Sequence, residues 1–368
     1  MARRWYEIDN VEEIPSPALI VYPDRCEENI RRMISLAGGT ARLRPHVKTH
    51  KMAEMVRLQL AAGIDKFKCA TIAEAEMLAR AGARDVLLAY PIVGPNIGRL
   101  LKLVESFPET RFSALADDAE AVRAISRQFA DRSRSIEIVL DIDNGMHRSG
   151  ISPAAAADLY RLLATLPGVS PGGLHVYDGH IRDADLAERA EHVRRDFASV
   201  DTLWRALIDG GLPVPRVVAG GTPTFPIHAR RSDVECSPGT CVFWDIGYAT
   251  KFPDFDFLHS AVLLTRVVSK PTAERLCLDL GYKAVSPDNQ QPRVSLLDLP
   301  EAVPVVHSEE HLTVESPLAK EFKVGDCLYG VPYHICPTVA LHREAVVVEN
   351  GRAVARWPVA ARDRMLTV

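Results

Sequence analysis

Between residues 18 and 220, two kinds of segment alternate along the chain. Short continuous apolar runs are typical of strands buried on both faces, and longer segments repeat apolar residues at helical spacing. The first apolar run covers residues 18–22. Further strands are predicted at residues 41–48, 66–71, 85–90, 111–115, 136–143, 172–177 and 216–219, and helices at 52–62, 72–81, 96–105, 119–129, 153–166 and 186–209.

This alternation predicts a parallel barrel. Strands that alternate with helices lie parallel and are joined by right-handed crossovers. With the first run included, about eight strands fall within roughly 240 residues, which matches a (β/α)₈ TIM barrel. The alternative is a doubly wound open sheet, which usually has fewer strands.

Beyond about residue 250 the helical spacing ends, and short strand-like runs follow one another between turn signals such as Glu349-Asn350-Gly351. They predict a mostly antiparallel β domain, with strands at 258–268, 275–280, 293–297, 311–315, 327–331, 339–341 and 345–348. We therefore assign residues 16–250 to the barrel, and residues 1–15 with 251–368 to the β domain.

The composition narrows the choice of partners. The 368 residues are 47% hydrophobic and 25% charged with a net charge of −4, so no large basic field exists to bind nucleic acid. No apolar run has the length of a signal peptide or a membrane span. The seven cysteines are scattered without a close pair, which is typical of a reducing compartment. We therefore expect a cytoplasmic protein that binds neither nucleic acid nor membrane.

Residues 44–51, at the end of the predicted strand 41–48, carry the first candidate chemistry. Reacting groups in a parallel barrel sit at the carboxyl ends of the strands. Pro45 and Val47 interrupt the basic residues, so Lys48 can be desolvated, and a desolvated lysine becomes a nucleophile toward aldehydes. We hypothesise that Lys48 holds pyridoxal 5'-phosphate as a Schiff base. The alternative is a basic surface loop.

Two more strand ends carry side chains that suit this cofactor. The turn at Asn144-Gly145 lets Arg148 fold back, where its guanidinium can keep a phenolate oxygen ionised. The alternative for Arg148 is a loop arginine paired with a nearby aspartate. Tyr177 ends a strand and can bond a ring nitrogen, and His180 lies in the following loop, where it faces substrate or is a surface histidine.

Two glycine–hydroxyl segments follow near the last predicted strand. Gly221 and Thr222 lie in the first, and Gly239 and Thr240 lie in the second. Exposed backbone N–H groups beside a hydroxyl can bind phosphate without a positive side chain. In barrels the phosphate usually lies by the last two strands, so these segments are the predicted phosphate site.

The β domain contributes a candidate metal pair, His334 and Cys336. Residues two apart on a strand face the same side, so both side chains can bind one ion. A thiolate with an imidazole favours zinc or a similar transition metal, and two ligands leave open positions, as in a catalytic site. The alternative is a chance pairing.

Together these motifs resemble those of the fold-type III pyridoxal-phosphate enzymes. Residues 144–150 are similar to a segment of alanine racemases. Residues 44–51 and 334–336 are similar to the lysine motif and the metal pair of D-threonine aldolases, D-serine dehydratases and D-3-hydroxyaspartate dehydratases. The resemblance covers nearly the whole chain. It implies an alanine racemase-like barrel with a β domain, and a homodimer with active sites at the subunit interface.

The same resemblance implies roles for the candidate residues. It places the Schiff base on Lys48, the phenolic oxygen near Arg148, the ring nitrogen near Tyr177, and the phosphate at Gly221, Thr222, Gly239 and Thr240. Two positions depart from the D-threonine aldolases. Some of these aldolases have aspartate in place of Cys336, so the cysteine is more similar to the metal pair of the dehydratases. The aldolases also have a catalytic histidine at the position of Asp183, so His180 is expected to serve instead.

The resemblance therefore implies a lyase that cleaves D-3-hydroxy amino acids, with D-threonine giving glycine and acetaldehyde. A divalent zinc, manganese or magnesium ion on His334 and Cys336 would bind the 3-hydroxyl, and His180 or a metal-bound water would remove its proton. The same residues suit a D-serine or D-3-hydroxyaspartate dehydratase, in which Lys48 removes the Cα proton and ammonia is released. A third alternative is a pyridoxal-phosphate binding protein without turnover.

Overall fold

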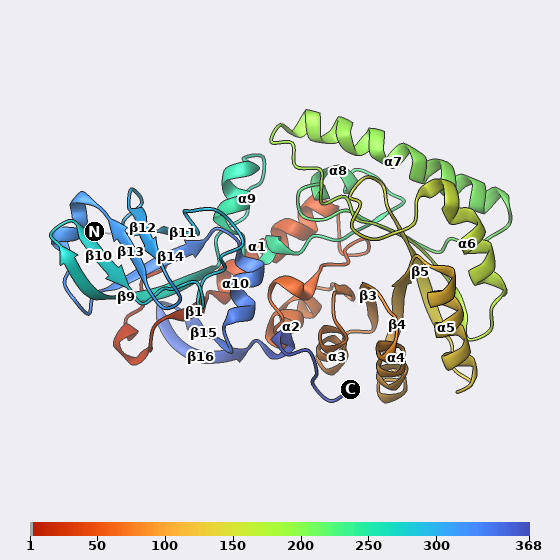
Figure 1. Cartoon of the computed structure of the whole chain (residues 1–368), viewed down its shortest axis with the longest axis horizontal. Helices are drawn as coiled ribbons and strands as arrows, with labels where there is room; N and C mark the ends of the chain where they lie inside the picture. Colours follow the sequence, from red (N-terminus) through yellow and green to blue (C-terminus); the bar gives the residue numbers. More distant parts are fainter. Residues whose placement is uncertain (1–2) are drawn as a thin grey trace. The chain divides into compact units, whose positions relative to one another are not determined.

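Figure 1 shows the computed structural model, which describes residues 3–368. The chain forms two compact units, which are described one at a time. The barrel unit comprises Met33–Lys48, Glu54–Gly239 and Asp363–Val368, and the β unit comprises the chain up to Arg32 with Thr49–Ala53 and Thr240–Arg362. No helix among the described residues is long and apolar enough to cross a membrane.

The barrel unit is built on seven parallel strands whose order in the sheet equals their order in the chain. Helices connect consecutive strands and flank the sheet (Figure 1). The strands are β2 (Lys66–Cys69), β3 (Asp85–Pro91), β4 (Arg111–Ala116), β5 (Ile136–Ile142), β6 (Val169–Val176), β7 (Val217–Ala219) and β8 (Glu235–Cys236). The helices are α2 (Ala53–Ala61), α3 (Ile72–Arg80), α4 (Pro95–Ser106), α5 (Ala119–Ala130), α6 (Pro153–Thr165), α7 (Leu186–Asp209) and α8 (Phe225–His228).

The segment from Leu43 to His46 closes this sheet. Leu43 bridges Cys236 of β8, and His46 bridges Lys68 of β2, both in parallel orientation. Backbone hydrogen bonds join the segment to both edge strands, at 2.9 Å from the Arg44 N–H to the Cys236 oxygen and 2.9 Å from the Lys68 N–H to the Pro45 oxygen. The segment therefore occupies the position of an eighth strand, and the predicted (β/α)₈ barrel is confirmed.

Local signals in the sequence set where the barrel helices begin. Thr71, Asp118 and Asp185 precede α3, α5 and α7, and each accepts hydrogen bonds from backbone N–H groups in the first turn. An apolar cluster within the parallel sheet consists of Leu87, Leu115, Val139 and Val218. Apolar side chains fill the interior of such a barrel, so polar side chains gather at the strand ends.

The β unit is a nine-stranded sheet, antiparallel except where β1 (Ala18–Val21) pairs with β15. This confirms the predicted mostly antiparallel β domain. The other strands are β9 (Ala261–Thr272), β10 (Arg275–Leu278), β11 (Val294–Leu296), β12 (Val303–His307), β13 (Leu312–Glu315), β14 (Cys327–Pro332), β15 (Glu344–Glu349) and β16 (Arg352–Pro358). Helix α1 (Pro23–Ala37) begins in this unit, and α9 (Ile246–Lys251) and α10 (Ile335–Leu341) lie within it.

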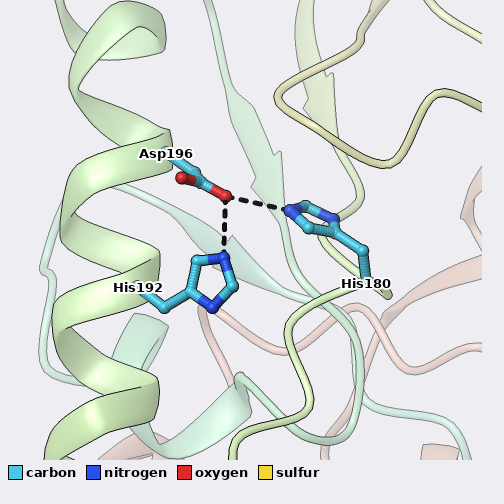
Figure 2. A group of neighbouring side chains, drawn as sticks. All are labelled: His180, His192 and Asp196. Carbon is cyan, nitrogen blue, oxygen red and sulfur yellow. Dashed lines mark hydrogen bonds and ion pairs between the residues drawn. The ribbon is translucent and has the colours of Figure 1, made fainter.

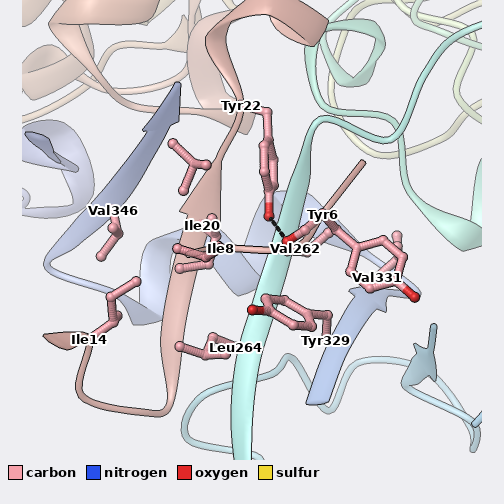
Figure 3. Packing of buried hydrophobic residues seen from close by; sticks show 11 residues of the cluster. Tyr6, Ile8, Ile14, Ile20, Tyr22, Val262, Leu264, Tyr329, Val331 and Val346 are labelled. Carbon is pink, nitrogen blue, oxygen red and sulfur yellow. Dashed lines mark hydrogen bonds between the residues drawn. The ribbon is translucent and has the colours of Figure 1, made fainter. Parts of the chain in front are cut away.

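Figure 3 shows the core of the β unit, where side chains of β1, β9, β14 and β15 pack against residues near the start of the chain. Ile20, Val262 and Leu264 are fully buried there. The Tyr22 hydroxyl donates a 2.6 Å hydrogen bond to the Tyr6 carbonyl, which satisfies a polar atom inside the cluster. This contact ties Tyr6 to the end of strand β1.

Two expectations about elements are corrected. The apolar run 18–22 forms β1, but β1 lies between β9 and β15 of the β unit and not in the barrel. A continuous apolar run fits any central strand, so the pattern alone does not identify the sheet. Residues 339–341, predicted as a strand, belong to helix α10. Strands β12 and β16 were not predicted, because they are largely exposed edge strands without apolar alternation.

Candidate active site

A cavity of about 610 Å³ lies at the carboxyl ends of the barrel strands. Its lining includes Lys48, Arg148 and Tyr177, so the structure brings together three of the residues that the sequence predicted. Lys48 lies in the short 3₁₀ turn Val47–Thr49 that follows the closing segment of the barrel. Cavities of this size accommodate small ligands and cofactors.

Three basic side chains lie near the Tyr177 ring in this cavity. The Nζ atoms of Lys48 and Lys68 each lie 5.8 Å from the ring centroid, and the Cζ atom of Arg148 lies 4.7 Å from it. Like charges held close together in a partly buried site repel one another unless an anion neutralises them. The cavity therefore fits a ligand with several negative charges, such as a phosphorylated phenolate.

Lys68 is a cavity residue that the sequence analysis missed. It is buried, and its Nζ lies 3.4 Å from His175 Nε2. His175 Nδ1 in turn lies 2.7 Å from an oxygen of Asp141, and the Ser149 hydroxyl donates to the other oxygen at 2.9 Å. Burial, with a contribution from the nearby Lys48 charge, lowers the pKa of Lys68 to about 7. The sequence did contain a signal for this residue, because a lysine between Phe67 and Cys69 interrupts the apolar end of a buried strand.

The two predicted phosphate segments meet in part. The Gly239 N–H donates to the Thr222 hydroxyl at 3.1 Å, which joins the first segment to the second. Gly220 has φ +73°, and a Cβ there would lie 2.6 Å from His228. A Cβ at Gly221 would lie 2.9 Å from the Tyr177 ring, so both positions need glycine.

Buried side chains hold the first of these segments in place. The Thr224 hydroxyl donates to Asp178 at 2.7 Å, and His228 Nε2 lies 2.7 Å from the other Asp178 oxygen. The Gly221 N–H donates to the same Thr224 hydroxyl at 3.3 Å. Thr240 belongs to the β unit, where its hydroxyl lies 3.6 Å from Cys336 Sγ. Phosphate binding by these four predicted residues stays a prediction.

The structure brings His334 and Cys336 together at the start of a helix and not on a strand. His334 is the N-cap of α10 and Cys336 is a residue of its first turn, so the interpretation of one strand face is wrong. The two side chains nevertheless hydrogen-bond to each other. Cys336 Sγ also lies 3.2 Å from the hydroxyl of Thr49, the residue that follows Lys48 in the chain.

The surroundings of this pair suit a metal ion. Asp288 bonds His334 Nδ1, which leaves Nε2 as the nitrogen available to an ion. A carboxylate on the second nitrogen of a histidine is the usual support of a metal-binding imidazole. Burial lowers the pKa of His334, but its interactions with Cys336 and Asp288 outweigh burial and raise that pKa to about 9. An imidazole and a thiol, with a carboxylate that orients the imidazole, are side chains that zinc and similar transition metals prefer.

His180 does not belong to the cavity lining that the structure describes. Its Nε2 lies 2.9 Å from Asp196 on α7, because the loop after β6 packs its side chain against that helix. Asp183, which holds the position of a catalytic histidine in the D-threonine aldolases, bonds His192 of the same helix at 2.8 Å. The role of His180 as the catalytic base stays a prediction.

The barrel with a lysine-bearing cavity at its carboxyl face, joined in one chain to an antiparallel β unit, defines an alanine racemase-like protein. The family described as alanine racemase, N-terminal domain, matches residues 21–245, and a serine dehydratase domain matches residues 260–348. The chain therefore belongs to the alanine racemase-like family of fold-type III pyridoxal-phosphate enzymes.

Its relatives include several lyases. The chain is 28% identical over 361 residues to a D-threonine aldolase of Arthrobacter sp., covering 96% of this chain and 94% of that protein. It is 28% identical to the D-threo-3-hydroxyaspartate dehydratase of Delftia sp. strain HT23, covering 95% and 98%. The crystal structure of D-threonine aldolase from Filomicrobium marinum has a TM-score of 0.89 at 28% identity, covering 98% and 99%. Aldolases and dehydratases of this kind are lyases, and this chain is a lyase of their family.

Proposed function

We propose that this protein is a pyridoxal-phosphate and metal-dependent lyase that cleaves D-3-hydroxy amino acids between Cα and Cβ, with D-threonine giving glycine and acetaldehyde. The observation that carries the proposal is the cavity in which Lys48, Lys68 and Arg148 surround Tyr177. Its excess of positive charge suits both the anionic cofactor and the carboxylate of an amino acid.

In this proposal, Lys48 attaches the cofactor and Arg148 keeps its phenolic oxygen ionised. Tyr177 meets the ring nitrogen, and Gly221, Thr222, Gly239 and Thr240 hold the phosphate through N–H and hydroxyl groups. When bound, the cofactor ring accepts the electrons released as the substrate bond breaks. A neutral tyrosine at the ring nitrogen leaves that nitrogen uncharged, which limits how strongly the ring attracts electrons.

We propose that His334 and Cys336 bind a divalent ion, with Asp288 orienting His334. Such an ion acts as a Lewis acid and lowers the pKa of a hydroxyl bound to it. The thiolate and imidazole donors support zinc, and manganese or magnesium are the alternatives. The Thr49 hydroxyl, 3.2 Å from Cys336 Sγ, is a further polar group beside the proposed ion.

We propose Lys68, in preference to His180, as the group that takes the proton of the 3-hydroxyl. The Lys68 amine lines the same cavity as Lys48, and a pKa of about 7 allows it to accept and return a proton near neutral pH. The neutral His175, oriented by Asp141, accepts a hydrogen bond from that amine and holds it in place. His180 is engaged by Asp196 instead.

The alternative reaction is dehydration of D-serine or D-3-hydroxyaspartate. It is supported by the match of residues 260–348 to a serine dehydratase domain and by the similarity to the Delftia dehydratase. The same side chains serve both reactions, because the outcome depends on whether the Cα–Cβ bond or the Cα–H bond is broken. Binding of the cofactor without turnover is the third candidate, and the homodimer and the cytoplasmic location stay predictions.

Product analysis decides between these reactions. The purified protein, supplied with pyridoxal phosphate and zinc, manganese or magnesium, is given D-threonine, L-threonine, D-serine or D-3-hydroxyaspartate in separate assays. We expect acetaldehyde and glycine in equal amounts from D-threonine and no product from L-threonine. Pyruvate and ammonia from D-serine, without acetaldehyde from D-threonine, would replace the aldolase with the dehydratase. No product from any of the four amino acids would support binding without turnover.

A further inference from the structure

A second group of side chains that could bind a metal ion lies in the barrel unit, apart from the proposed catalytic residues. Figure 2 shows His180, on the loop after β6, facing His192 and Asp196, which lie one turn apart on α7. Each of the three offers one ligand atom, and these atoms lie within 4.8 Å of one another. All three side chains are partly buried.

The distances match those between ligands of a single ion. Asp196 Oδ2 lies 2.9 Å from His180 Nε2 and 3.3 Å from His192 Nε2. Zinc–nitrogen and zinc–oxygen bonds of about 2.0–2.1 Å in a tetrahedral site place neighbouring ligand atoms about 3.3 Å apart. Small side-chain adjustments would therefore bring all three atoms within bonding distance of an ion.

The protons available to His192 also point to an ion. Both of its ring nitrogens face carboxylate oxygens, with Nδ1 2.8 Å from Asp183 and Nε2 3.3 Å from Asp196. A neutral imidazole has one N–H and can satisfy one of these contacts. A metal ion bound to Nε2 would replace the need for a proton in the contact with Asp196. Asp183 would then accept the Nδ1 proton and orient the metal-binding imidazole. The alternative is a protonated His192 between two carboxylates.

The remaining contacts turn one oxygen of Asp196 toward both histidines. Arg195 donates to Asp196 Oδ1 at 3.1 Å, so the second oxygen, Oδ2, is the one turned to both histidines. A Cβ at Gly145 would lie 2.9 Å from His180 Nε2, so this glycine gives the imidazole its space.

We propose that His180, His192 and Asp196 form a second site for a divalent transition-metal ion, distinct from the His334–Cys336 pair. Two imidazoles and one carboxylate favour zinc and its neighbours in the transition series over magnesium or calcium. The ion would tie the loop between β6 and α7 to that helix. The same loop begins at Tyr177 and Asp178, which pack against and anchor the Gly221 segment.

Cobalt loading tests this site without an activity assay. His334→Ala and Cys336→Ala are combined in the full-length protein, which is stripped with a chelator, loaded with Co²⁺ and desalted. We expect one cobalt per chain by mass spectrometry, with visible cobalt absorption and no thiolate-to-cobalt band. Adding D196N or H192Q should reduce the cobalt to background, whereas E191A, an exposed position on the same helix, should retain it. Equal cobalt with and without D196N would overturn the proposal and leave the protonated His192 as the explanation.

Cobalt loading of the unsubstituted protein tests this site and the His334–Cys336 pair separately. This experiment does not depend on whether a variant folds. Loaded with cobalt, the unsubstituted protein should hold two ions per chain, and the thiolate-to-cobalt band should account for one of them. A single ion with the thiolate band would reject the second site alone. A single ion without that band would reject the His334–Cys336 pair and retain the site on α7.

Discussion

Replacing the buried Lys68 with methionine should change how the stability of the cofactor-free protein depends on pH. Burial and the charge of Lys48 lower the pKa of Lys68 from 10.5 to about 7 in the folded chain. Between these two pKa values the unfolded chain binds more protons than the folded chain, so the free energy of unfolding falls as pH is lowered. Lys68→Met removes this dependence, because methionine has no proton to bind.

The size of the effect follows from the pKa difference. Each pKa unit corresponds to about 1.4 kcal/mol, so the whole shift destabilises the folded protein by about 5 kcal/mol once the pH has fallen to 7. Over the measurable range from about pH 9 to about pH 7, the stability of Lys68→Met relative to the unsubstituted protein should increase by about 3 kcal/mol. Below about pH 7 the difference should level off, since both states of the chain then carry the proton.

Urea unfolding of both cofactor-free proteins at several pH values measures this difference. Other groups titrate in both proteins and cancel in the comparison. Lys66→Met is the matched control, because Lys66 lies on the same strand, is partly exposed and pairs with Glu235 at 3.1 Å. A difference between the unsubstituted protein and Lys68→Met that stays constant from pH 9 to pH 7 would refute the desolvation of Lys68. The role of this amine as the proton acceptor would fall with it.

Three further substitutions test other parts of the proposed site. Lys48→Ala should abolish the visible absorption of the bound cofactor, and a surviving band would reject this attachment point. His334→Ala should lower kcat by about 100-fold or more at limiting metal, with recovery in excess ion and unchanged cofactor absorption. Full activity of that variant without added metal would contradict the metal role. Gly221→Ala places a Cβ 2.9 Å from the Tyr177 ring and should weaken pyridoxal-phosphate binding by about 10-fold in a spectrophotometric titration; unchanged affinity would argue against a phosphate site there.

The order of strands and helices was readable from the sequence because the barrel repeats one pattern. Buried parallel strands are continuous apolar runs, whereas the amphipathic helices between them repeat apolar residues every three or four positions. The strand-end positions of Lys48 and Tyr177 followed from the same pattern, and both line the cavity. Sheet membership was not readable, because β1 has the composition of any central strand and only its pairing with β9 and β15 places it.

The details of the site depend on contacts between distant segments, which periodicity does not report. His334 and Cys336 were interpreted as two residues on one strand face, yet they begin α10, and Pro337 lies in its first turn, where a missing N–H costs no helical hydrogen bond. The partners of Lys68 come from β5 and β6, so its burial became visible only when the strands were in place. His180 was placed correctly in a loop, but Asp196, which engages it, is 16 residues further along the chain.

The three basic side chains around Tyr177 have a consequence for the fate of the protein in a cell. Without an anion in the cavity, Lys48 and Arg148 repel each other, and Lys68 adds its charge as the pH falls to about 7, so under the proposed function the unloaded chain is the less stable form. Newly made chains would then compete for a limited supply of vitamin B6, and those that fail to load would open more often to proteases. Starvation for the vitamin should therefore reduce the abundance of the protein itself, in addition to the fraction that is active.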